Sequence, residues 1–143
     1  MALYVHSYGS NIQKRRLVED VAWWFIDKQL SRYKNLDIQI DLMPLDDVDG
    51  SCVYLGYNEF EVEIDKKLKG EDIVTCVLHE MIHVEQHLRN LYNINNCDTT
   101  TPYPDRPYEK DAYERSEILL KEYINSVWED NNGRSTKVWD LVA

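Results

Sequence analysis

The sequence predicts a single α+β domain over residues 1–143, and three observations support that fold class. Apolar residues recur at helical spacing near the N-terminus, alternate with polar residues in the next third, and return to helical spacing twice afterwards. The 143 residues are 43% hydrophobic, which is typical of a globular domain with a modest core. No internal repeat and no composition shift marks a second domain.

One helix and three strands are expected in the first half of the chain. Leu17, Val21 and Phe25 recur at three- and four-residue spacing and form one apolar face of a helix. Further along, apolar and polar residues alternate strictly, which is typical of half-buried strands. We expect these strands to form a small antiparallel sheet, with a tight turn at Tyr57-Asn58. The expected bounds are 11–33 for the helix, and 36–42, 52–57 and 59–66 for the strands.

Two further helices are expected in the second half. The first follows Gly70 and runs to about Tyr92. It is apolar around most of its circumference, which predicts a buried central element. A long polar loop with three prolines separates it from the last helix, which begins at Pro107 and runs to about Trp128.

The central helix contains the pattern H-E-x-x-H, as His79-Glu80-Met81-Ile82-His83. Histidines four residues apart lie about 40° apart around a helix, so both imidazoles can reach one ion. Two neutral imidazoles are typical zinc ligands, and the glutamate can take a proton from a water on the metal. The ion would lower the pKa of that water and polarise the carbonyl under attack. An ordinary helix with histidines that bind no metal is the plain alternative.

A catalytic zinc site usually takes a third protein ligand. His87 lies four residues after His83, but no glycine turns the chain back between them. We therefore expect His87 on the surface or at the edge of a cleft. The last helix offers four acids instead, Glu109, Asp111, Glu114 and Glu117.

Helical geometry separates these four acids. Glu109 lies at the centre of the apolar stripe of the last helix, which includes Ala112 and Tyr113. Asp111, Glu114 and Glu117 lie about 160°, 140° and 80° away from it. A carboxylate on a buried face needs a partner, and a metal ion is one. Glu109 is therefore the predicted third ligand, and a helix-capping role is the plain alternative.

This pattern resembles the gluzincin metallopeptidases, on the residues "HEMIH" and "PYEKDAYE", in which Glu109 lies 26 residues after the second histidine. The small size resembles the minigluzincins and the SprT-like or phage-encoded metallopeptidases. The resemblance implies a zinc-dependent endopeptidase with His79, His83 and Glu109 as ligands and Glu80 as general base. It also implies that an edge strand, "EFEVEID", pairs with an extended peptide substrate.

Two features depart from the family pattern. Many gluzincins have an aspartate four residues after the ligand glutamate, and Tyr113 stands there in this chain. The cysteine zinc ribbon of many SprT-like proteins has no counterpart. A donor is also needed for the transition-state oxyanion, and Tyr103, Arg106, Tyr108 and Tyr113 are candidates. Tyr113 is favoured as a catalytic residue by its place on the apolar stripe.

Charge and composition limit which partners and which cellular compartment are expected. The net charge of −10 disfavours binding to nucleic acid, which needs a positive field. No apolar run is long enough for a membrane span, and no signal peptide is evident. Cys52, Cys76 and Cys97 are expected to be reduced thiols, which favours the cytoplasm. The expected partner is a peptide or protein substrate, and the oligomeric state is left open.

The substrate is left open as well. Glu61, Glu63 and Asp65 are expected to give the cleft rim a preference for basic peptides. The alternative to a peptidase is a non-catalytic or highly specific regulatory zinc-binding module that uses the same site. In that case the loop "NNCDTTTPYPDRP" would close the cleft and the tail "KVWDLVA" would occupy it. A hydrolase of cell-wall peptides is a third interpretation, which would require export.

Overall fold

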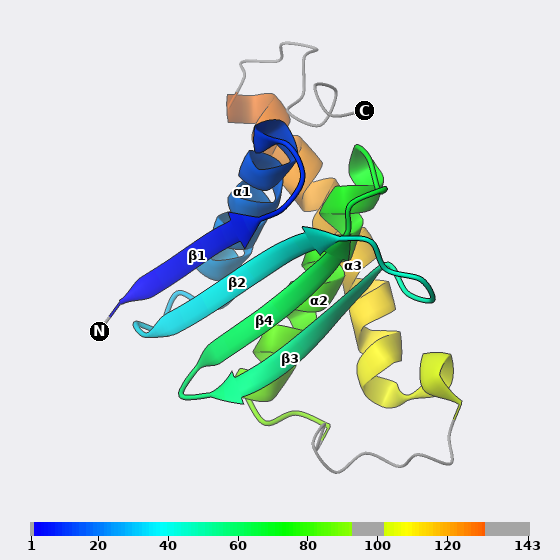
Figure 1. Cartoon of the computed structure of the whole chain (residues 1–143). Coiled ribbons are helices and arrows are strands. Elements are labelled where there is room, and N and C mark those ends of the chain that lie inside the picture. The colour runs from blue at the N-terminus through cyan, green and yellow to red at the C-terminus, as the bar shows by residue number, and fades with distance from the viewer. Residues whose placement is uncertain (1, 93–101, 131–143) are drawn as a thin grey trace.

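A computed structural model describes residues 2–92 and 102–130 and confirms the α+β class. One face of a four-stranded sheet is covered by helices, and the other face is open in the described part of the chain (Figure 1). None of the described helices has the length and apolar character needed to cross a membrane. The elements in chain order are β1 (Leu3–Tyr8), α1 (Ile12–Gln29), β2 (Leu36–Met43), β3 (Gly50–Gly56), β4 (Glu59–Asp65), α2 (Glu71–Leu88), the short 3-10 helix η2 (Tyr103–Asp105) and α3 (Pro107–Asp130).

The sheet is mixed, with the strand order β1-β2-β4-β3. β2 pairs in parallel with both β1 and β4, while β3 pairs antiparallel with β4. The expected sheet of three antiparallel strands is therefore wrong in strand number and in the pairing of β2, whereas the expected antiparallel pairing of β3 with β4 is confirmed. The physical reason is that α1 carries the chain back to the end of the sheet where β1 began, so β2 runs alongside β1. The predicted turn between β3 and β4 is present, with positive φ angles of 53° at Tyr57 and 60° at Asn58.

β1 has no counterpart in the predicted elements. Ser7 is buried and Leu3 and Val5 pack against the core, whereas Tyr4 and Tyr8 are exposed. This two-residue alternation is a strand signal, although it is short and Ser7 interrupts its apolar side.

The core lies between the sheet and the helices α1 and α2. The inward residues of β2 and β4 alternate as predicted, and the larger ones, such as Ile38, Ile40 and Ile64, are 0% exposed. α1 ends at Gln29, four residues before the predicted end, and residues 30–35 lead the chain into β2. α2 likewise ends four residues early, at Leu88. α3 packs against α2 (Figure 1).

The open face of the sheet is acidic. Asp37 and Asp41 of β2 lie in register with Glu59 and Glu63 of β4, and Glu61 lies between the two pairs. β4 is thus an interior strand, and the expectation that its segment "EFEVEID" forms the edge is wrong. The edge beside β4 is β3, because the β3–β4 hairpin places β3 on the outer side. We call the five residues Asp37, Asp41, Glu59, Glu61 and Glu63 the acidic sheet face.

Candidate metal centre

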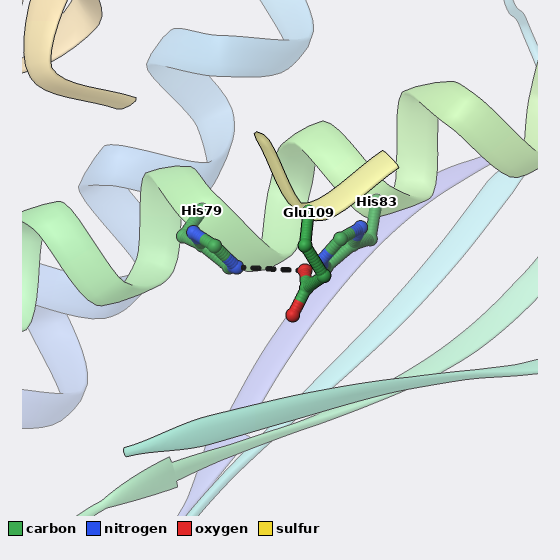
Figure 2. Close-up of side chains that lie close together, drawn as sticks. All are labelled: His79, His83 and Glu109. Atoms are coloured by element: carbon green, nitrogen blue, oxygen red, sulfur yellow. Dashed lines mark hydrogen bonds and ion pairs between the residues drawn. The ribbon is translucent and has the colours of Figure 1, made fainter. Parts of the chain in front are cut away.

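α2 is the buried helix that positions the H-E-x-x-H residues. Glu71 and Asp72 occupy its first turn, where the helix dipole favours negative charge. Its apolar residues, such as Leu78 and Met81, are 0% exposed, as the pattern predicted. The histidines lie on the side of α2 that faces α3, so the start of α3 supplies the side chains next to them (Figure 2).

His79, His83 and Glu109 point toward one another (Figure 2). Glu109 Oε1 lies 3.2 Å from His79 Nε2 and 2.5 Å from His83 Nε2. The possible ligand atoms of the three residues all lie within 4.8 Å of one another. Their side chains are only 12%, 10% and 2% exposed, in the order given. Across residues 2–92 and 102–130, no other group of His, Cys, Asp or Glu side chains converges in this way.

Glu109 is positioned by the first turn of α3. The helix begins at Pro107, and the Glu109 amide donates a hydrogen bond to the Arg106 carbonyl, at 2.9 Å. The other three acids of this helix lie elsewhere. Glu114 and Glu117 are exposed, and Asp111 accepts a hydrogen bond from Gln86. The helical stripe thus selected the acid that lies beside the two histidines.

Gln86 fixes the orientation of His83. The Gln86 amide nitrogen donates to the Tyr108 carbonyl and to Asp111 Oδ2, both at 2.9 Å. Since the Tyr108 carbonyl can only accept, the amide oxygen of Gln86 must face His83 Nδ1, which lies 2.7 Å away. His83 Nδ1 therefore carries a hydrogen, and Nε2 faces Glu109. Sequence analysis missed Gln86, because its role depends on α3.

His83 and Glu109 favour an ion pair in which a proton on His83 Nε2 faces the Glu109 carboxylate. Burial opposes the charged form of His83, but the hydrogen bond to Glu109 and the nearby Glu80 charge outweigh it and raise the pKa of His83. Burial likewise opposes ionisation of Glu109, yet hydrogen bonds with His79 and His83 hold the pKa of Glu109 well below its usual range. A divalent cation would take the place of that proton, so this donor set fits a metal.

Glu80, the residue after His79 in α2, is also buried. It is 5% exposed, and it forms no hydrogen bond or ion pair with another described residue. Burial raises the pKa of Glu80 to about 7, and the nearby His83 and His79 only partly oppose this. A carboxylate with a pKa near neutrality is suited to accept and return a proton.

A cleft of about 690 Å³ reaches the cluster through His79 and Glu80. The loop 45–49 and the start of β3 form one wall, and the first half of α2 forms the floor. Tyr103, Tyr113 and Ser116 line the side toward α3. The cleft therefore adjoins both the cluster of His79, His83 and Glu109 and the Glu80 carboxylate.

Gly50 allows the start of β3 to pass close to α2. A side-chain carbon at Gly50 would lie 2.8 Å from Cys76 Sγ and 3.1 Å from Glu80 Oε2, so only glycine fits without displacement. Cys76 is 8% exposed, and its thiol lies 3.4 Å from the Asp49 carbonyl. This agrees with a packing role for Cys76, at the rim of the cleft.

The tyrosines and His87 lie partly where predicted. Tyr113 is 54% exposed, which corrects the expectation of a core-facing side chain, but its ring lies 4.6 Å from that of His79 and lines the cleft. Tyr103 forms a hydrogen bond with Glu109, and burial together with that bond raises the pKa of Tyr103. Tyr108 is buried, with its ring 5.9 Å from that of His83. His87 lies outside the cluster, with its ring 5.7 Å from that of Tyr54.

Other sequence-based expectations agree with the structure only in part. Glu61 and Glu63 belong to the acidic sheet face and do not line the cleft, whereas Asp65 does. The expected closing of the cleft by the 95–107 loop and its occupation by the C-terminal tail involve residues 93–101 and 131–143, which lie outside the described residues. Cys97 lies there too.

Comparisons of the chain with protein-family models, with curated proteins and with solved structures found no match.

Proposed function

We propose that this protein is a zinc-dependent peptidase of the gluzincin type, in which His79, His83 and Glu109 hold the metal and Glu80 is the general base. The observation that carries this proposal is the convergence of three ligand atoms next to a cleft and to the buried Glu80 carboxylate, which has no hydrogen-bond partner among the described residues. The resemblance of "HEMIH" and "PYEKDAYE" to the gluzincins supports the same assignment.

The donor set favours zinc in a catalytic arrangement. Two imidazole nitrogens and one carboxylate oxygen suit zinc, whereas calcium and magnesium prefer oxygen alone. Structural zinc sites usually take four protein ligands, and the described residues supply three. When bound, zinc would act as a Lewis acid that acidifies water and polarises a carbonyl.

Glu80 would transfer the proton from the attacking water to the leaving amine during hydrolysis. It would accept a proton from the attacking water while the water oxygen bonds to the peptide carbonyl carbon. As the carbon–nitrogen bond breaks, Glu80 would return that proton to the amine nitrogen. Tyr113 is the better-placed tyrosine to donate to the developing oxyanion, because the Tyr103 hydroxyl already contacts Glu109.

β3 would be the strand that receives an extended substrate. It is the edge of the sheet beside β4, and it begins at Gly50, next to Glu80. Exposed strand edges bind extended peptides through main-chain hydrogen bonds. The role assigned by resemblance to "EFEVEID" therefore passes to the neighbouring strand.

Zinc content and hydrolysis test this proposal separately. Wild-type protein should contain about one equivalent of zinc, and Glu109→Ala should lose most of it, because two imidazoles alone hold the ion weakly. Glu80→Gln should retain zinc and lose at least about 10²-fold in hydrolysis of a peptide library. Zinc would be measured by mass spectrometry of metals after gel filtration.

Glu114→Ala is a matched control, since this acid lies in the same helix and is exposed. It should retain both zinc and hydrolysis. Wild-type protein without zinc would refute the metal site. A zinc-loaded protein that cleaves no library peptide would favour the regulatory module instead.

A further inference from the structure

Four exposed acids line the cleft next to His79. Asp46, Asp47 and Asp49 come from the loop before β3, and Asp72 comes from the first turn of α2. None of these four carboxylates forms an ion pair or side-chain hydrogen bond with another described residue. Asp65 also lines the cleft, but it is buried and accepts from the Lys67 amide. No lysine or arginine lines the described cleft.

These acids are not arranged for a small inorganic ion. The only described group whose ligand atoms converge within 4.8 Å is His79, His83 and Glu109. Apolar side chains, Leu45, Val48 and Leu68, lie among the acids along the same cleft. Spread carboxylates beside apolar surface suit a long side chain with an aliphatic stem and a charged end.

A second observation indicates that a ligand enters this cleft. Glu80 lines it, is 5% exposed, and has no hydrogen-bond partner among the described residues. A buried polar group without a partner is costly unless a bound species satisfies it. The acids and Glu80 line one cavity of about 690 Å³, so a single extended ligand can contact both.

The distances along α2 suit a peptide. Asp72 and His79 are seven positions apart on the helix, which corresponds to roughly 10 Å at 1.5 Å per residue. An extended peptide advances about 3.3–3.6 Å per residue. A side chain from a residue within about three positions of the metal centre therefore reaches the acids.

We propose that the carboxylates of Asp46, Asp47, Asp49 and Asp72 bind the lysine or arginine side chain of a peptide substrate, within about three residues of the bond that is cut. This inference rests on the proposed peptidase function, because it takes the bound peptide to be the substrate that is cut. It names the substrate class as peptides with a basic residue near the cleavage site.

Binding can be tested without hydrolysis. Zinc-loaded Glu80→Gln protein would be titrated with fluorescent peptides that contain either lysine or its uncharged isostere norleucine, followed by anisotropy. The lysine peptide should bind about tenfold more tightly. The triple substitution Asp46→Asn, Asp47→Asn and Asp49→Asn should remove that difference. Their side chains are exposed and form no ion pair within the described part of the chain, so folding should be retained.

The acidic sheet face offers a control with the same change in net charge. Asp41→Asn, Glu61→Gln and Glu63→Gln remove three charges that do not line the cleft, so the preference for lysine should persist. Equal binding of both peptides to the Glu80→Gln protein would overturn the inference. An equal loss of preference in the two triple variants would also overturn it, because net charge would then explain the binding.

A library digested by the wild-type protein separates this inference from the proposed function. Cleavage next to basic residues would support both, and cleavage without such a preference would overturn the cleft assignment alone. Selective binding of the lysine peptide without cleavage would support the cleft and refute the peptidase.

Discussion

Gln86 determines which nitrogen of His83 faces Glu109. Its two amide hydrogens are held by the Tyr108 carbonyl and Asp111, so its oxygen is left for His83 Nδ1. Gln86 is 0% exposed, so water does not compete for these bonds. Partners of this kind fix the tautomer and the ring plane of a metal-binding histidine.

Gln86→Leu should therefore weaken zinc binding by about 10–100-fold, because the His83 ring loses its orienting acceptor. Affinity would be measured by competition with a chromophoric chelator. Asp111→Ala, which removes one of two anchors and leaves the His83 contact, should have a smaller effect. Gln39→Leu on the open side of β2 is a control and should bind zinc like the wild type. A folded Gln86→Leu protein with unchanged affinity would contradict the positioning role.

Residues from neighbouring elements form the site, and sequence patterns predict only some of these elements and residues. Periodicity predicted α1, α2, α3, β2 and β4, because an apolar face is a local property of each segment. The same arithmetic selected Glu109, since its stripe must pack on α2. It misplaced Tyr113, because a residue at the margin of a stripe is exposed wherever a cleft replaces the core.

The features that sequence patterns missed depend on non-local pairing. The parallel pairing of β1 with β2 joins residues about 33 positions apart, such as Leu3 and Leu36, and no local pattern specifies it. Gln86 and the acids of the 45–49 loop acquire their roles only when α3 and β3 lie beside α2. The histidine motif and the helical spacing thus predicted His79, His83 and Glu109 of the candidate centre, but not the residues that surround them.

At the interface of α2 and α3, Ala112 allows close approach. It is 0% exposed and one turn after Glu109. Ala112→Leu should lower the free energy of unfolding by about 1–3 kcal/mol and also weaken zinc binding, because the larger side chain pushes Glu109 away from α2. Urea unfolding and chelator competition would measure the two effects.

Ala22→Leu provides the matched control, since Ala22 is also 0% exposed but lies in α1. It should destabilise the fold to a similar degree and leave zinc affinity unchanged in the folded protein. Similar affinity losses in both variants would mean that packing in general, and not the position of Glu109, controls the site.

At the scale of the whole molecule, the acidic residues behind the net charge of −10 include those of two separate surfaces. One is the acidic sheet face, where Asp37 and Glu59, and Asp41 and Glu63, are neighbours in register on adjacent strands. The other is the cleft beside His79, on the helical side. Like charges on adjacent strands destabilise a sheet, whereas like charges around a cleft attract an opposite charge.

The acidic sheet face has a consequence for how the protein responds to ionic strength. Screening lengths fall from about 10 Å at 0.1 M to about 3 Å at 1 M salt, so repulsion across the sheet weakens. The urea midpoint of the metal-free protein should rise as sodium chloride is added, and a fall would contradict this. Asp41→Asn with Glu63→Gln should reduce the rise. The affinity for a lysine peptide should decrease over the same range, so dilute buffer would favour binding of that peptide and concentrated salt would favour the folded state.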